Sequence, residues 1–391
     1  MKPTLQRPIT PMAGISTPVV PAIQPSVVYA SECPGALDAQ YEGRVQGYTY
    51  AREGHPNADA LARQIDNMEG MEGGIVTGSG MSAVAATLLG LTRFGDHVIG
   101  GSQLYGRSLR LMTEDLPRLG IETSLADATD AGAIAKVMRP NTKLVLIEVV
   151  TNPGIRIADL TGIADLCRER GALLVVDNTF TTPRAIRPVD HGADIVIHSL
   201  TKLLAGHSDA TLGWVCAREA ALNERLRVFA VTMGLTASPF DCWLAERGLA
   251  TFDLRFEHTQ ATARRLADWL SVQKGVTRVL YPTRPDHPEA GRAQSLLHGQ
   301  GCNMVSFEIT GGRAAADAFA RAASGIAFAP TLGDVGTTLS HPASSSHRAL
   351  DPQAREAIGI SEGFFRVSVG LEEPEALISC FDQGLHAARG L

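Results

Sequence analysis

The sequence of 391 residues has no long apolar run and no block of like charge. Its hydrophobic stretches fall well short of the roughly 20 apolar residues that a membrane-spanning helix needs. The N-terminal segment MKPTLQRPITPMAG also lacks the apolar core of a secretory signal. We therefore expect a cytoplasmic protein without a membrane partner.

The six cysteines are widely separated, and no two of them form a C-x-x-C pair. This spacing argues against a metal site and against a disulfide framework. The formal net charge of -6 comes with no basic stripe, which argues against nucleic acid as a partner. With 45% hydrophobic residues, the chain is long enough for one large domain and one smaller domain.

The most informative stretch is residues 194–209 (DIVIHSLTKLLAGHSD), which begins with an apolar run typical of a short buried strand. Ser199, Thr201 and Lys202 follow that run. Hydroxyl groups can donate to phosphate oxygens, and a lysine amine can condense with an aldehyde to form a Schiff base. Pyridoxal phosphate (PLP) carries both groups. Taken alone, the stretch fits a solvated surface lysine equally well.

A second stretch, residues 172–180 (ALLVVDNTF), favours the cofactor because it reads as an apolar strand that ends at Asp177. Ligands bind at the carboxyl ends of parallel strands, so Asp177 and Lys202 should open onto one crevice. A carboxylate there can pair with the protonated pyridine nitrogen of PLP. Without the lysine stretch, Asp177 would more simply be read as the cap of a turn or helix.

Residues 73–86 read as a short strand, a glycine-rich turn and the start of a helix. Free backbone amides at a helix start can bind phosphate, and glycine lets the anion approach closely. We therefore expect the amides of Gly80 and Met81 to complete a phosphate site with Ser199 and Thr201.

Strand and helix patterns alternate through residue 214, which predicts an α/β fold with a mostly parallel sheet and helices on both of its faces. Residues 1–53 are rich in proline, glycine and serine and predict an extended, non-helical arm. A long ordered arm needs a surface to pack on, and a neighbouring subunit is one candidate. A large PLP-binding domain should follow at residues 54–251. Residues 252–391 should form a smaller α+β domain, with strands at 276–280, 304–309 and 364–369.

A series of ordered motifs resembles the PLP-dependent Cys/Met-metabolism (trans-sulfuration) enzymes over nearly the whole chain. The motifs are 48–57 (YTYAREGHPN), 79–83 (SGMSA), 105–106 (YG), 148–153 (EVVTNP), 177–180 (DNTF), 198–202 with 206–209, 341–343 (HPA) and 366–372 (RVSVGLE). That family includes cystathionine γ-synthases, cystathionine lyases, methionine γ-lyases and O-acylhomoserine sulfhydrylases. The resemblance implies the PLP-dependent transferase fold type I with a sheet of the seven-stranded type. It also implies an amino-acid substrate, an N-terminal arm that clasps a neighbouring subunit, and a homo-oligomer built as a dimer of dimers.

The same resemblance implies roles for five more residues. Tyr105 would lie on the pyridine face and donate a proton to the leaving group. Asn152 would contact the ring hydroxyl of the cofactor and the substrate carboxylate, which Arg366 would also bind. Arg52 would bind the phosphate of the adjacent subunit's cofactor, with Tyr50 beside it. Without the resemblance, Tyr105 would be read as an ordinary half-buried tyrosine. Arg52 would pair with Glu53 or Glu42 on the surface, and Arg366 with Glu372 or Glu373.

Residues 329–341 (APTLGDVGTTLSH) are predicted to be a substrate-facing loop in which Thr331 contacts the substrate. Cystathionine γ-synthases and γ-lyases usually carry a glutamate where this chain has Pro330. Proline offers no charge to the distal ammonium of cystathionine, which counts against that substrate. Bacterial cystathionine β-lyases often have tryptophan where this chain has Leu332. Methionine γ-lyases place a cysteine at Arg107, which could meet a distal anionic group or point to solvent.

The expected reaction is replacement of the γ-substituent of an O-acylhomoserine by a thiol or sulfide, with Lys202 as the base. The alternative is γ-elimination from methionine, cystathionine or canavanine, and a cystathionine β-lyase ranks below both. Aminotransfer on the same fold and a catalytically silent homologue are rivals from other classes.

Overall fold

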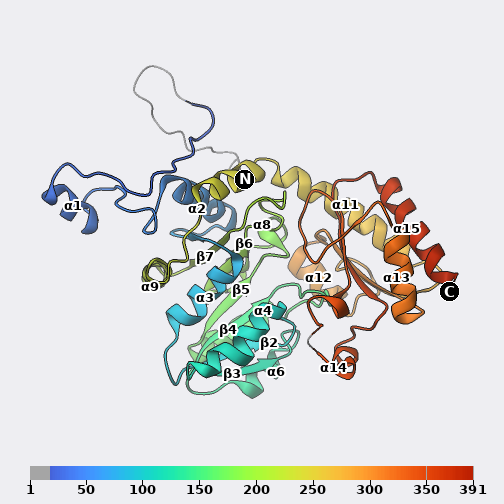
Figure 1. Cartoon of the computed structure of the whole chain (residues 1–391). Helices are drawn as coiled ribbons and strands as arrows, with labels where there is room; N and C mark the ends of the chain where they lie inside the picture. The colour runs from blue at the N-terminus through green and yellow to red at the C-terminus, as the bar shows by residue number, and fades with distance from the viewer. Residues whose placement is uncertain (1–17, 349, 391) are drawn as a thin grey trace.

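The computed structural model describes residues 18–348 and 350–390, so the first 17 residues of the predicted arm lie outside it. Its larger sheet has seven strands in the order β1-β7-β6-β5-β4-β2-β3 (Figure 1). Every neighbouring pair is parallel except those of β7, which runs antiparallel to β1 and β6. This sheet confirms the predicted fold class. The strands are β1 (Ile75–Thr77), β2 (His97–Gly101), β3 (Glu122–Ala126), β4 (Thr142–Glu148), β5 (Leu173–Asp177), β6 (Ile195–Ser199) and β7 (Gly213–Ala217).

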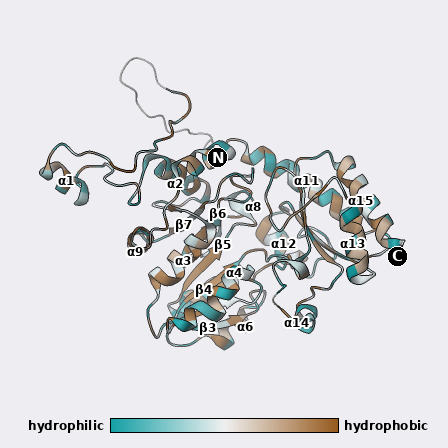
Figure 2. Ribbon diagram, viewed as in Figure 1, coloured by the Kyte–Doolittle hydropathy of each residue, from teal (hydrophilic) through white to brown (hydrophobic). Residues whose placement is uncertain are grey.

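The central strands β4, β5 and β6 are buried on both faces, which explains why they are largely continuous apolar runs rather than alternating ones. Val145 and Ile147 of β4 belong to one buried cluster, whereas Leu144 and Leu146 belong to another. Figure 2 shows the central strands and α3 as largely hydrophobic. The helices of this part are α2 (Pro56–Glu69), α3 (Gly80–Leu91), α4 (Gly106–Arg110), α5 (Leu116–Arg118), α6 (Ala131–Val137), α7 (Leu160–Arg170), α8 (Thr182–Ala185), α9 (Ala220–Thr232) and α10 (Pro239–Leu249), with a π turn at Leu111–Asp115 and a 3-10 turn at Pro188–His191.

A second sheet has five strands in the order β10-β11-β12-β9-β8, antiparallel except between β10 and β11. The three predicted strands of this part are confirmed as β8 (Val276–Leu280), β9 (Met304–Ile309) and β12 (Phe364–Ser368). The predicted loop at 329–341 is partly strand, because it contains β11. The other elements are α11 (Phe252–Leu270), α12 (Ala290–Leu297), α13 (Gly312–Ala322), β10 (Ala327–Phe328), β11 (Thr338–Ser340), a 3-10 turn (Pro342–Ser344), α14 (Pro352–Ala357) and α15 (Pro374–Arg389).

The middle of the described N-terminal arm extends away from the body of the protein (Figure 1), whereas Pro21 contacts α10 by accepting a hydrogen bond from Trp243. It contains the helix α1 (Pro34–Tyr41), so the prediction of a wholly non-helical arm is wrong there. Proline is tolerated at the first helical position because its missing N–H would have no partner within the helix. Because α1 buries little besides Ala39, its sequence lacks the apolar period by which helices are predicted.

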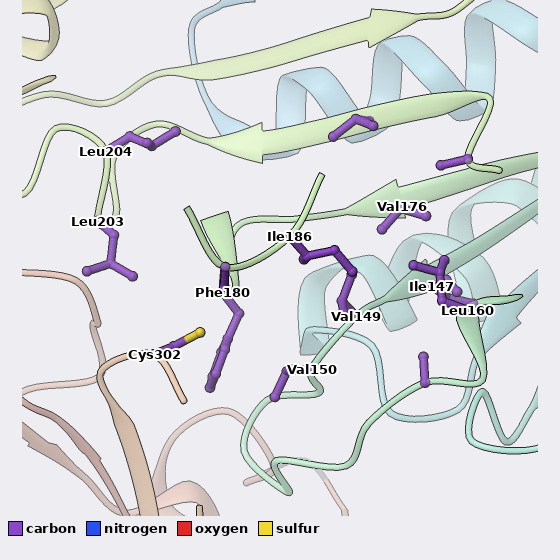
Figure 3. Close-up of a cluster of buried hydrophobic side chains, with 14 of the residues drawn as sticks. Ile147, Val149, Val150, Leu160, Val176, Phe180, Ile186, Leu203, Leu204 and Cys302 are labelled. Carbon is purple, nitrogen blue, oxygen red and sulfur yellow. The ribbon is translucent and has the colours of Figure 1, made fainter. Parts of the chain in front are cut away.

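The two sheet-containing parts meet in an apolar junction where the side chain of Cys302 points toward Phe180 (Figure 3). The Cys302 thiol also contacts the carbonyl oxygen of Thr181 at 3.8 Å. Among the described residues, no helix is both long enough and apolar enough to cross a membrane.

Candidate active site

The carboxyl ends of β4, β5 and β6 open onto a cavity of about 310 Å³. Segments from the second sheet close its other side, including Pro330 and Leu332. The cavity thus gathers residues that are far apart in the sequence. Its predicted members are Gly80, Met81, Tyr105, Asn152, Asp177, Ser199, Thr201, Lys202, Thr331 and Arg366.

The start of α3 lies directly against the end of β6. A Cβ atom on Gly80 would lie 2.6 Å from Cβ of Ser199, so only glycine permits this approach. Ser79 caps the helix by accepting a hydrogen bond from the amide of Ser82 at 3.0 Å. The cap uses the amide of Ser82, which leaves the amides of Gly80 and Met81 without an intrahelical partner and able to meet an anion in the cavity.

The two hydroxyl residues at the end of β6, Ser199 and Thr201, differ in whether their side chain is already hydrogen-bonded. Thr201 Oγ1 donates to the carbonyl of Leu212 at 3.2 Å and accepts from its amide at 3.0 Å. The side chain of Ser199 lies beside Gly80, and its amide donates to Thr179 Oγ1 at 2.7 Å. Thr201 thus fixes the link between β6 and β7, which leaves Ser199 as the freer donor.

Two carboxyl groups line the cavity side by side, because Glu148 of β4 and Asp177 of β5 are register partners. Burial raises the pKa of both groups, and the charge of Asp177 raises that of Glu148 further. Hydrogen bonds from Thr179, including its amide at 3.0 Å, oppose the effect at Asp177. A cation in the cavity would therefore be stabilised beside Asp177, as a protonated pyridine nitrogen requires.

Glu148 is a site residue whose contacts the sequence does not reveal. Its Oε1 accepts from the amide of Tyr105 at 2.7 Å, and its Oε2 accepts from the amide of Asn152 at 3.3 Å. It therefore ties the start of α4 to the loop after β4. The sequence feature that could have identified Glu148 is its position at the end of an apolar run, β4, as Asp177 is at the end of β5.

Lys202 lies in the turn after β6, and its Nζ donates to Thr331 Oγ1 at 3.4 Å. Burial lowers the pKa of Lys202, and the positive charge of Arg366 lowers it further. The amine therefore loses its proton more readily than a surface lysine, which suits a nucleophile or a base.

Arg366 of β12 is only 5% exposed. Its Nη1 donates to Asn152 Oδ1 at 2.9 Å and its Nη2 to the carbonyl of Thr331 at 2.5 Å. Its Nε has no hydrogen-bond partner among the described residues. Burial lowers the pKa of Arg366 to about 10, so the guanidinium stays charged at neutral pH. A buried cation with a spare donor is suited to bind a carboxylate.

A buried pair, His198 and Glu69, lies beside the carboxyl ends of β5 and β6. His198 Nε2 lies 2.5 Å from Glu69 Oε1, which also accepts from Asn178 Nδ2 at 2.8 Å. Because His198 precedes Ser199 and Asn178 follows Asp177, this pair links the ends of β5 and β6 through α2.

Three predicted or considered residues lie outside the lining of this cavity. Tyr50 and Arg52 lie together on the arm, with the guanidinium carbon 5.4 Å from the tyrosine ring centre. Arg52 Nη1 donates to the carbonyl of Val231 at 3.3 Å. Arg107 is exposed on α4. The cavity of a single chain is therefore built without them.

The fold and this cavity define a PLP-dependent enzyme of fold type I: a lysine and a carboxylate face a helix start across the carboxyl ends of a mostly parallel sheet. The chain belongs to the family described as Cys/Met metabolism PLP-dependent enzymes, whose model matches residues 13–386. It is accordingly a PLP-dependent trans-sulfuration enzyme.

The relatives of the chain catalyse different reactions within that family. It is 39% identical over 338 residues to cystathionine beta-lyase MetC of Bacillus subtilis, covering 86% of each chain. It is 37% identical over 349 residues to O-succinylhomoserine sulfhydrylase of Pseudomonas aeruginosa, covering 89% of this chain and 86% of that one. The structure of cystathionine gamma synthase from Xanthomonas oryzae pv. oryzae is similar with a TM-score of 0.90 and 37% identity, covering 95% and 94%. Sequence similarity therefore identifies the family but does not identify the particular reaction, which must be inferred from the site.

Proposed function

We propose that this enzyme replaces the γ-substituent of an O-acylhomoserine with a thiol or sulfide. The observation that carries the proposal is the arrangement around Thr331. Its hydroxyl accepts from the amine of Lys202, and its carbonyl accepts from Arg366. An amino acid whose carboxylate pairs with Arg366 therefore has its α-carbon within the range of Lys202.

The residues present fit PLP, and the glycine at the start of α3 leaves room for its phosphate. The amides of Gly80 and Met81, together with Ser199, would bind the phosphate. Asp177 would hold the proton on the pyridine nitrogen, and Lys202 would hold the aldehyde. When bound, PLP supplies an electron sink for the negative charge that forms at the α-carbon of the substrate.

Three side chains of the cavity would then act on the substrate. Arg366 orients it through the carboxylate, and Asn152 Oδ1 restrains the guanidinium. Lys202, whose pKa is lowered, takes the proton from the α-carbon and returns protons later in the reaction. Tyr105 lines the same cavity and would give a proton to the departing γ-substituent.

The wall formed by Pro330 and Leu332 carries no charge, which argues against a substrate with a distal ammonium group. The carboxylates in the described lining are Glu148 and Asp177, and both lie on the sheet side of the cavity. A distal ammonium, as in cystathionine, would find no carboxylate at that wall. The same apolar wall suits a thioether, so γ-elimination from methionine is the second candidate.

A substrate panel tests the proposal. O-acetyl- and O-succinylhomoserine, each with sulfide or methanethiol, are compared with methionine and cystathionine, and the products are identified. We expect thioether or homocysteine formation from an O-acylhomoserine to have the highest kcat/KM. Dominant release of 2-oxobutyrate from methionine would favour the γ-lyase instead. Dominant release of pyruvate from cystathionine would make the enzyme a β-lyase and overturn the proposal.

We also propose a homo-oligomer in which the arm of one subunit completes the site of another. Tyr50 and Arg52 do not line their own cavity, and Tyr50 is 41% exposed. Large exposed hydrophobic side chains on the arm and near α9 would be covered in such an assembly. They are Val19, Val20, Ile23, Val27, Val28, Val228 and Met233.

A further inference from the structure

Arg255 lies near the start of α11, 5% exposed, and donates to the turn that carries Lys202. Its Nη1 bonds the carbonyl of Leu203 at 2.7 Å, and its Nη2 bonds the carbonyl of Leu204 at 3.0 Å. The same Nη2 reaches the carbonyl of Gly248 at 2.9 Å. The two residues directly after Lys202 are therefore held by one buried guanidinium.

Two glycines make room for this arginine. Gly206 has a φ of +77°, and a Cβ atom on it would lie 2.0 Å from Nη1 of Arg255. A Cβ atom on Gly248 would lie 2.1 Å from the carbonyl oxygen of Ala205, so glycine lets the end of α10 touch the turn. The backbone around Arg255 is thus closely packed, and a side chain at Gly206 or Gly248 would clash with it or with Arg255.

The turn is fixed on its other sides as well. The side chains of Leu203 and Leu204 belong to the main apolar cluster (Figure 3). The segment that carries Thr331 packs against it, because a Cβ atom on Gly333 would lie 2.4 Å from the amide nitrogen of Leu203. Val335 donates its amide to the carbonyl of Gly206 at 2.9 Å. These contacts hold the position of the turn. The hydrogen bonds of Arg255 additionally fix the orientation of the peptide planes after Lys202.

We infer that Arg255 is a positioning residue for Lys202. By holding the carbonyls of Leu203 and Leu204, it sets the direction in which the Lys202 side chain leaves the turn toward Thr331. The inference rests on the proposed function, which gives Lys202 its role as base. A catalytic group displaced by about 1 Å can cost on the order of 10²-fold in rate, so a small loosening of this turn should be measurable.

Arginine is suited to this role because its planar guanidinium presents several donors in a fixed geometry. Nε also donates to Oγ1 of Thr251, the N-cap residue of α11, at 3.1 Å, which orients the guanidinium plane. Burial lowers the pKa of Arg255 to about 10, so it still carries its charge at neutral pH. Lysine keeps that charge and cannot hold two successive carbonyls in one plane.

The test compares Arg255→Lys and Arg255→Met with Arg265→Met in the full-length holoenzyme. Arg265 lies on the same helix and pairs with Glu375 on the surface, so its variant controls for a lost arginine on α11. We expect both Arg255 variants to lose about 10²-fold in kcat per bound PLP. Their KM for the amino acid should stay unchanged because Arg366 and Asn152 are intact. Arg265→Met should match the wild type.

A second readout does not depend on turnover. Ala205 donates its amide to the carbonyl of Leu200 at 2.9 Å, and Gly206 donates to that of Lys202 at 2.8 Å. In the cofactor-free protein, amide hydrogen exchange at these two residues should be faster in both Arg255 variants and unchanged in Arg265→Met. Arg255→Lys carries the test alone if Arg255→Met does not fold.

Wild-type kcat per bound PLP in the folded Arg255 variants, with only a lower free energy of unfolding, would overturn the inference and make Arg255 purely structural. Failure of the proposed function is recognised separately. Borohydride reduction of the wild-type holoenzyme followed by peptide mapping identifies the lysine that holds PLP. Attachment to a lysine other than Lys202 would refute the proposed function itself. Attachment to Lys202 with normal kcat in the variants would refute only the role of Arg255.

Discussion

Replacing Gly80 with alanine tests whether the start of α3 binds the phosphate group of PLP. The new methyl group would lie 2.6 Å from Cβ, 2.9 Å from Oγ and 3.0 Å from Cα of Ser199. Carbon atoms prefer a separation of about 3.5–4.0 Å, so α3 and the end of β6 must move apart by about 1 Å. Both elements are packed in the core, and such overpacking typically costs about 1–3 kcal/mol of stability.

The same displacement should weaken PLP binding as well as the fold. Losing one charge-assisted hydrogen bond from the helix start to the phosphate costs about 1.5–3 kcal/mol. At 1.4 kcal/mol per factor of ten, the Kd for PLP should rise by about 10- to 100-fold. The assay titrates cofactor-free protein with PLP and follows the visible absorbance of the bound cofactor, while urea unfolding of the cofactor-free protein gives the stability change.

Gly291 supplies the matched control, because it lies in α12 and a Cβ atom on it would meet nothing within 4 Å. Gly291→Ala should leave PLP affinity unchanged and stabilise the fold by roughly 0.5–1 kcal/mol. A Gly80→Ala protein that binds PLP with wild-type affinity would refute the assignment of the phosphate to this helix start.

The remaining predictions concern the lysine, the arm and the buried carboxyl pair. Lys202→Ala should abolish turnover, and wild-type turnover in that variant would disprove the role of Lys202. Arg52→Ala should weaken PLP binding by about 1.5–3 kcal/mol. Mixing it with Lys202→Ala should restore part of the activity if the site is shared, and hetero-oligomers without recovery would contradict sharing. Burial and the charge of Asp177 raise the pKa of Glu148 from 4.5 to about 8. The folded chain thus keeps a proton that the unfolded chain releases, so the cofactor-free protein should lose stability as pH rises through that interval. The urea midpoint of Glu148→Gln should vary less with pH there, and an unchanged profile would exclude Glu148 as the source.

The local sequence pattern was sufficient to predict those strands that are buried and therefore apolar along their own length. The apolar runs before Asp177 and Ser199 predict strands β5 and β6. The rule that ligands bind at the carboxyl ends of parallel strands brings Asp177 and Lys202 to one edge. The helix α1 was not predicted because it buries little apolar surface, so its sequence shows no helical periodicity of apolar residues.

The sequence by itself therefore determined the fold class, the cofactor and the polar residues at the strand ends, because strand period and helix-start chemistry are local properties. Only the tertiary structure decided which of those residues touch. Arg366 meets Asn152 across 214 positions of the chain, and Lys202 meets Thr331 across 129. Arg255 reaches the carbonyls after Lys202 from a helix that begins about 50 residues later. Such contacts depend on how whole elements pack against one another, and no pattern within a single element records that packing.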